Sequence, residues 1–349
     1  MVLRFVNTSI LALIILLTLS GFYGLVWAFP GWMYEIHRIS GWALIGLIPW
    51  KIGISLRSLG RGLRPSFDRG IIPIVSVALS AVVCLIIALG LMWAWRVGPE
   101  LLWLNYSVIS WHWILALAIV PPFALHAWQR WPRPKRNEFL SRQGFIKLAG
   151  LSFIGVAGWG ASKVLASYRA TPDEPRAASG SRLKGYLSGN SFPVTNSVGD
   201  GQKPIDLSAW RLLVGGDVVT PLTLTYQDLL DLPSHSLVAT LDCTVGWYSV
   251  QRWKGIRLQT LIDQARPQGK VLNVHFRAVE GHGQGLPFVE AKDVILCTHV
   301  GGAPLGHIHG FPLRAVVPSR RGWFWVKWLS EIVIISAAAH SDRQAHRTT

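Results

Sequence analysis

The sequence is poor in cysteine, in acidic residues and in charge of either sign. Three cysteines occur in 349 residues, and 18 acidic side chains stand against 34 Lys and Arg, a formal net charge of +16. Three cysteines allow one disulfide at most, which excludes a disulfide-rich scaffold. Charged residues make up 15% of the chain and apolar residues 50%, so long stretches carry almost no charge.

The apolar excess lies before residue 168, in five long runs. They cover about residues 7–29, 37–56, 71–95, 107–128 and 145–167. Four carry few charges and are long enough to cross a bilayer core of roughly 30 Å as helices. The fifth is bracketed by Lys147 and Lys163, so a buried helix of a soluble protein stays open as an alternative for it. We predict an all-α bundle of five transmembrane helices.

The basic residues gather in alternate loops between these runs. The second loop holds Arg57, Arg61, Arg64 and Arg69, and the fourth holds Arg130, Arg133, Lys135, Arg136 and Arg142. Short loops enriched in Lys and Arg mark the cytoplasmic side of a membrane protein. We therefore assign the excess charge to orientation in an inner-membrane lipid bilayer and not to nucleic acid. The pattern predicts a cytoplasmic N-terminus and an extracytoplasmic, periplasmic location for the chain after residue 168.

The composition changes after residue 168. A Pro-, Gly- and Ser-rich stretch follows, which is typical of a linker, and then short β-branched runs alternate with helix-like pieces without an internal repeat. We expect this second part to be an α+β, largely β domain with a single core. The predicted parts are a four-helix region (1–140), the fifth helix (141–167), the linker (168–185), the mixed domain (186–340) and a polar tail (341–349).

The start of the fifth helix, "SRQGFIKLAGLSFIGVAG" (141–158), resembles a twin-arginine export signal. Ser141, Arg142, Phe145 and Lys147 fit that signal, whereas Gln143 replaces its second arginine. A basic flank before a transmembrane helix explains the same residues, and both interpretations stay open. The export route carries folded domains, so a working signal would imply a cofactor in the second part.

Histidines in the apolar runs are candidates for function, because ionisable groups are costly in a bilayer. His37 and His112 begin the second and fourth helices, near the predicted outer face. His126 follows His112 by 14 residues, about 21 Å along a helix, while Lys51 holds the matching place on the second helix. We expect His126 and Lys51 to reach water at the cytoplasmic boundary, although a second haem there stays open.

The segments "HRISGW" (37–42) and "SWHW" (110–113) resemble the histidine segments of membrane cytochrome b families. The resemblance implies one haem b near the outer face, with His37 and His112 as axial ligands of its iron. Gly41 would allow the macrocycle close to the helix. A purely interfacial role for both histidines stays open.

Cys243 follows a strand-like run and precedes a glycine and two tryptophans. This setting fits a packed thiol, a disulfide with Cys297 or a metal ligand. We expect Cys297, in "VILCTHV", to pack in a strand, and Cys84 to lie in the third helix.

The segment "TLDCTVGWYSVQRWKGIRLQTLI" (240–262) resembles the molybdenum-binding segment of the sulfite oxidase superfamily. Further motifs of that superfamily follow in order, at "GNSFPVTN" (189–196), "WRLLVGGDVVTPLTLTYQDLLDLP" (210–233) and "GGAPLGHIHGFPLRAVVPSRRGWFWVKWLSEI" (301–332). Over most of 186–336 the chain is identified as a member of this superfamily. The resemblance implies a molybdopterin cofactor whose molybdenum (Mo) is bound by the Cys243 thiolate.

The resemblance also implies a cradle for the cofactor. Its residues would be Asn190, Pro193, Val194, His309, Arg314, Trp325, Val326 and Lys327. Arg314 can grip a phosphate through two hydrogen bonds, whereas Lys327 acts as a point charge. The catalytic candidates are Cys243 and, facing the metal or its substrate, Arg320, Arg321 and His282. Ser191 departs from the pattern, because sulfite oxidases have histidine there.

Together these features predict a membrane-anchored molybdopterin-dependent oxidoreductase. It would transfer an oxygen atom, either oxidising sulfite, a small oxyanion, or reducing an S- or N-oxide. The haem would exchange electrons with a quinone or a redox partner protein. Two alternatives stay open: a molybdenum enzyme whose membrane part is only an anchor, and a non-enzymatic membrane protein that keeps the fold for binding or assembly.

Overall fold

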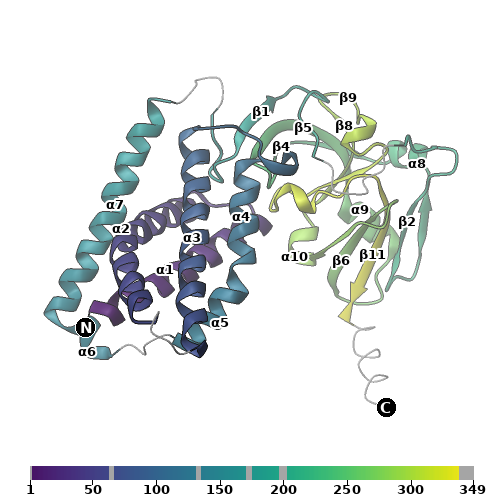
Figure 1. The fold of residues 1–349 in the computed structure, drawn as a ribbon. Coiled ribbons are helices and arrows are strands. Elements are labelled where there is room, and N and C mark those ends of the chain that lie inside the picture. The colour runs from purple at the N-terminus through teal and green to yellow at the C-terminus, as the bar shows by residue number, and fades with distance from the viewer. Residues whose placement is uncertain (1, 63–66, 131–134, 170–174, 196–202, 338–349) are drawn as a thin grey trace, which may run out of the picture. The chain divides into compact units, whose positions relative to one another are not determined.

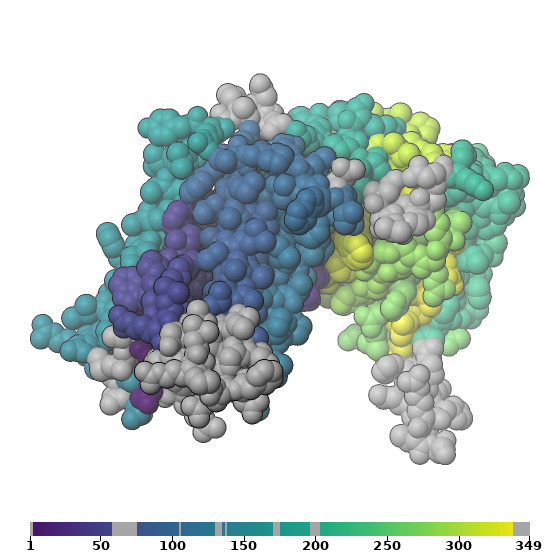
Figure 2. Space-filling model, in the orientation of Figure 1, coloured from purple at the N-terminus to yellow at the C-terminus, as the bar shows by residue number. Residues whose placement is uncertain are grey.

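The computed structural model describes residues 2–62, 67–130, 135–169, 175–195 and 203–337. Figures 1 and 2 draw the other residues in grey. The predicted tail (341–349) lies outside the described residues, as do Arg64 and Arg133 of the basic loops and part of the predicted linker (170–174). The chain divides into two units, the first made of Met1–Leu25 and Phe29–Gly180, the second of Val26–Ala28 and Ser181–Thr349.

The first unit is helical (Figure 1). Its α-helices are α1 (Val2–Val26), α2 (Gly31–Gly62), α3 (Phe67–Trp95), α4 (Val108–Ala118), α5 (Val120–Arg130), α6 (Arg136–Leu140) and α7 (Arg142–Ser167). Helices α4 and α5 follow one another through Ile119, and Pro121 and Pro122 at the start of α5 lack the N–H groups of a regular helix. The fourth predicted run therefore forms two helical segments.

Five stretches of the described residues are long and apolar enough to span a bilayer. They are Leu3–Val26, Gly31–Arg57, Val75–Trp95, Val108–Gln129 and Arg142–Ser167. The prediction of five long apolar helices is thus confirmed, while their insertion into a membrane stays a prediction. At the start of α7 the Ser141 side chain accepts a hydrogen bond from the Gly144 N–H at 3.1 Å. This is an ordinary N-cap, and it leaves the export-signal interpretation untested.

Glycines allow α7 to pack closely against α2. A Cβ added at Gly155 would lie 2.9 Å from the Ile39 carbonyl oxygen, and one at Gly158 would lie 2.7 Å from the Trp42 ring. Both distances are shorter than van der Waals contact, so larger side chains do not fit. Helix–helix contacts in membranes use small residues in this way.

Replacing Gly155 with leucine should destabilise the helical unit by about 2 kcal/mol, because the added side chain forces the two helices apart. The free energy of unfolding in detergent measures this loss. Gly150→Leu is the matched control on the same helix, because a Cβ there meets nothing within 4 Å. Equal stability of the two variants would contradict the close packing of α2 and α7.

The second unit contains two sheets. One has the path β1–β5–β8–β10, with β4 paired to β5 and β9 to β8; the other runs β3–β2–β11–β6–β7. The strands of the first sheet are β1 (Arg182–Tyr186), β4 (Ser234–Asp242), β5 (Trp247–Arg257), β8 (Ile295–Val300), β9 (Ala303–Pro304) and β10 (Arg314–Val316). Those of the second are β2 (Leu212–Gly216), β3 (Leu222–Leu224), β6 (Val271–Ala278), β7 (Gly283–Pro287) and β11 (Leu329–Ser336).

Among the described residues of this unit, three short α-helices accompany the sheets, α8 (Tyr226–Asp231), α9 (Leu258–Ala265) and α10 (Phe288–Ala291). One apolar cluster joins strands of both sheets, with Leu212, Trp253, Leu296 and Ile332 fully or almost fully buried. This agrees with the predicted domain of mixed secondary structure, rich in strands, around a single core. Burial of apolar side chains on β5 and β8 stabilises the first sheet, and the candidate site is built on that sheet.

Candidate active site

Cys243 lies in the turn between the two longest strands of the first sheet. Strands β4 and β5 pair up to Asp242 and Tyr248, and the Cys243 N–H donates to the Trp247 carbonyl at 2.8 Å. Gly246 closes the turn with a φ of 101°, a conformation that other residues rarely adopt. The glycine three residues after the cysteine is therefore a requirement of the turn that presents the thiol.

A pocket of about 60 Å³ opens beside this thiol. Seven of the predicted site residues line it: Cys243, Pro193, Val194, His309, Arg314, Trp325 and Lys327. They come from the segment after β1, the β4–β5 turn, strand β10 and the loops around it. The structure thus brings the proposed metal ligand and most of the proposed cradle into one place.

Arg314 is the strongest electrostatic feature of the pocket. Its side chain is 5% exposed and lies against the rings of Trp253 and Trp325. One Nη donates to the His309 carbonyl at 2.9 Å, but Nε has no partner within the described residues. Burial lowers the pKa of Arg314 to about 10, so the guanidinium is still charged at neutral pH. A buried cation with an unused donor fits an anionic ligand.

His309 offers an acceptor to the same pocket. Its Nε2 lies 2.7 Å from the Asn190 carbonyl oxygen, so Nε2 must carry the hydrogen. Burial, with Arg314 and Lys327 nearby, lowers the pKa of His309 and favours the neutral ring. The other nitrogen, Nδ1, is then an acceptor, and it is buried without a partner among the described residues. A ligand with an N–H donor would complete it.

Two predicted cradle residues, Asn190 and Val326, stabilise the residues that line the pocket. The Asn190 amide donates to the Pro304 carbonyl at 2.9 Å, and its oxygen accepts from the Gly306 N–H at 2.7 Å. Asn190 therefore holds the loop that carries His309. Val326 is 1% exposed and belongs to the core.

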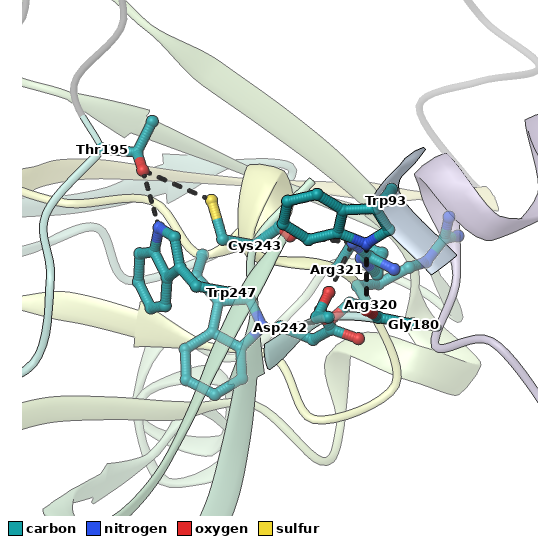
Figure 3. A network of polar contacts seen from close by, with 10 residues as sticks. Trp93, Gly180, Thr195, Asp242, Cys243, Trp247, Arg320 and Arg321 are labelled. Carbon is teal, nitrogen blue, oxygen red and sulfur yellow. Dashed lines mark hydrogen bonds and ion pairs between the residues drawn. The ribbon is translucent and has the colours of Figure 1, made fainter. Parts of the chain in front are cut away.

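Three of the four catalytic candidates do not line the pocket. Arg320 forms an ion pair with Glu290 at 2.5 and 2.8 Å. Arg321 lies 3.3 Å from Asp242 and donates to the Cys243 carbonyl at 2.9 Å, so it steadies the cysteine turn (Figure 3). The His282 ring stacks edge-on against Trp323, with centroids 5.6 Å apart. A direct role for them in binding substrate stays a prediction.

Sequence reasoning missed two side chains at the thiol, Thr195 and Trp247. Thr195 Oγ1 lies 3.5 Å from Cys243 Sγ and accepts from the Trp247 indole N–H at 3.0 Å (Figure 3). Both residues belong to motifs quoted above, but nothing in the sequence pairs positions 48 residues apart. Only the folded arrangement reveals this contact.

All three cysteines are free, so the disulfide between Cys243 and Cys297 is wrong. Cys297 is fully buried in β8, as expected. Burial raises the pKa of the Cys243 thiol, while the Val245 backbone, Thr195 and Arg321 act in the opposite direction. No group of three or more His, Cys, Asp or Glu side chains that could hold a metal ion occurs among the described residues.

The first unit holds a second candidate site. The rings of His37 and His112 lie edge to face, with centroids 6.4 Å apart and planes at 73°. His37 Nδ1 lies 2.8 Å from Ser20 Oγ, and His112 Nδ1 lies 2.8 Å from the Ile86 carbonyl oxygen. These contacts engage Nδ1 of both rings and leave Nε2 for a ligand.

Two glycines, Gly90 and Gly21, lie against the histidine pair, whereas Gly41 does not contact it. A Cβ added at Gly90 would lie 3.0 Å from the His112 ring, one at Gly21 would lie 3.6 Å from His37, and one at Gly41 would meet nothing within 4 Å. His126 is placed differently, with its Nε2 3.3 Å from Ser76 Oγ, and Lys51 donates to Asn7 Oδ1 at 3.2 Å.

Comparisons with known proteins bear on the second unit. Residues 200–342 match the family described as the oxidoreductase molybdopterin binding domain. The chain is 32% identical over 145 residues to the uncharacterized oxidoreductase YuiH of Bacillus subtilis (strain 168), which covers 41% of this chain and 73% of that protein.

Two further relatives have named activities. Mitochondrial sulfite oxidase of Rattus norvegicus is 28% identical over 191 residues, which cover 46% of this chain and 34% of that protein. The catalytic subunit MsrP, a protein-methionine-sulfoxide reductase of Xanthomonas axonopodis pv. citri (strain 306), is 30% identical over 148 residues, which cover 37% of this chain and 46% of that protein. The chain thus spans less than half the length of either.

Proposed function

Since the chain belongs to the family of the oxidoreductase molybdopterin binding domain, we propose that it is a membrane-anchored, molybdopterin-dependent oxidoreductase that transfers oxygen atoms. One observation carries the proposal: the Cys243 thiol and the buried, incompletely bonded Arg314 guanidinium line the same pocket. A soft sulfur ligand beside a site for an anion is what a pterin-bound molybdenum with a phosphate group requires.

The residues of the pocket fit that cofactor. Cys243 would bind the metal, Arg314 and Lys327 would compensate negative charge, and His309 Nδ1 would accept a hydrogen bond from the pterin. When bound, the cofactor supplies two-electron oxygen-atom transfer at its molybdenum. The protein orients it: Asn190 holds the His309 loop, and Arg321 holds the Cys243 turn through the carbonyl group.

The charge pairing around the pocket favours a neutral substrate. Arg320 and Arg321, the predicted partners of an oxyanion, are already neutralised by Glu290 and Asp242. Binding sulfite through Arg320 would require breaking its ion pair with Glu290, which is costly. Arg321 has an Nε donor that is unused among the described residues, but it does not line the pocket. We therefore favour reduction of an S- or N-oxide over oxidation of sulfite.

The histidine pair supports a haem b in the first unit. Metal–imidazole bonds of about 2 Å, one on each side of an iron, put the two ring centroids about 6 Å apart. The observed 6.4 Å fits, and both Nδ1 atoms already have partners. We propose that this haem exchanges electrons with a quinone or a redox partner protein, and that the five apolar helices hold it in the bilayer. His126 and Lys51, engaged elsewhere, give no support to a second haem.

An activity screen tests the direction of the reaction. The full chain, expressed with molybdenum cofactor synthesis, should contain about one molybdenum per chain and oxidise a reduced viologen dye with methionine sulfoxide or trimethylamine N-oxide. Sulfite with ferricyanide should be turned over at least about tenfold more slowly. A hydrogen bond between a charged arginine and the sulfite anion would be worth about 1.5–3 kcal/mol, and the paired arginines do not supply it. Faster turnover of sulfite would reverse the assignment. A folded protein without molybdenum would support a binding protein instead of an enzyme.

A further inference from the structure

Thr195, an exposed residue that lines the pocket, contacts the Cys243 sulfur. Its hydroxyl oxygen lies 3.5 Å from Sγ and 3.0 Å from the Trp247 indole nitrogen (Figure 3). Its backbone carbonyl accepts from Lys327 Nζ at 3.5 Å. Trp247 is itself placed by the β4–β5 turn and lies 6.3 Å, between ring centroids, from Phe192. Thr195 is therefore held from both its side chain and its backbone.

The hydrogen-bond inventory fixes what the hydroxyl can do. An indole N–H only donates, so the Thr195 oxygen is the acceptor in its contact with Trp247. A protonated Cys243 thiol donates to the same oxygen. A sulfur bound to a metal has no hydrogen, and the Thr195 hydroxyl then has its one hydrogen free to donate to that sulfur.

Cys297 provides a comparison within the chain. Its Sγ lies 3.8 Å from the Ile295 carbonyl oxygen, an acceptor that only a protonated thiol can satisfy. Cys243 instead faces a hydroxyl group, which can donate as well as accept. The hydroxyl contact of Cys243 therefore suits a thiolate, whereas the carbonyl contact of Cys297 does not.

We propose that Thr195 is a positioning residue that donates a hydrogen bond to the Cys243 sulfur and weakens the electron donation of that sulfur to the metal. The inference rests on the proposed function, in which Cys243 binds molybdenum. A hydrogen bond to a ligating sulfur draws charge away from the metal, which destabilises the oxidised metal and raises its reduction potential. Thr195 would thus make the bound metal easier to reduce.

Three variants of the full chain, loaded with cofactor, test this. Thr195→Val removes the donor at nearly constant volume, Thr195→Ser keeps it, and Thr223→Val is a matched control at an exposed position of β3. Redox titration followed by the Mo(V) electron paramagnetic resonance signal gives the potential and the spectrum. T195V should shift the potential downward and change the spectrum, whereas T195S and T223V should match the wild type.

The outcomes separate the two proposals. Absence of molybdenum from the folded wild type contradicts the proposed function itself. An unchanged potential and spectrum in loaded T195V overturns the role of Thr195 alone, as does a shift that T195S fails to reverse. If T195V binds no molybdenum, the T195S variant distinguishes the two explanations. Wild-type molybdenum content and a wild-type spectrum in T195S support the role of the hydroxyl group. Loss of molybdenum from both variants overturns that role.

Discussion

Replacing Cys243 with serine should reduce turnover by at least about a thousandfold, the scale on which loss of a group central to the reaction acts. A serine hydroxyl is a hard, weakly acidic ligand and does not replace a thiolate on a soft metal. Cys243 lies in a turn at the edge of a pocket and not in the core, so the fold should persist. Dye-linked assay of the purified full chain, with its molybdenum content, measures the effect.

The matched control is Cys84→Ser, because Cys84 is free and exposed on α3, outside the pocket. It should keep wild-type turnover. Activity of C243S within about tenfold of the wild type would remove the sulfur from the mechanism, whatever its position in the structure.

Replacing either His37 or His112 with alanine should abolish the b-type absorption band, because the proposed haem would lose one of its two axial ligands. Turnover driven by artificial dyes at the second unit should persist, while turnover coupled to a quinol should be lost. The reduced-minus-oxidised optical spectrum and the haem content of purified protein measure the first effect directly.

His126→Ala is the control for this pair, since its ring contacts Ser76. It should retain the band at full intensity. A folded wild type without any b-type band would favour a membrane part that only anchors the enzyme, and loss of the band in H126A would point to a different haem site.

Much of the fold could be predicted from apolar patterning. The five long helices follow from run length, although α2 begins at Gly31, before the apolar run, because polar residues such as Glu35 and Arg38 do not end a helix. Strand β5 could not be predicted so easily. Its buried face carries Ser249 and Gln251, whose hydrogen bonds to Gly185, Ser188 and Gly189 replace apolar contacts. Polar residues at inward positions hide the alternation that identifies a strand.

Site residues that stand in recognised motifs could be predicted from the sequence. Contacts between residues distant in the sequence could not. Cys243 and Arg314 stand in recognisable segments, and the structure places both at one pocket. The pairing of Arg320 with Glu290, 30 residues away, and of Thr195 with Cys243 depends on strand register and loop packing. The composition and the motif spacing do not predict such contacts.

The buried guanidinium of Arg314 affects the stability of the folded protein before it binds its ligand. A chain that has folded without its ligand keeps a positive charge in its interior with an unused hydrogen, whereas a ligand that neutralises it raises the free energy of unfolding by mass action. The ligand-free form then unfolds more often and is cleaved more readily by proteases. Proteolysis would therefore selectively remove molecules that never acquired their prosthetic group.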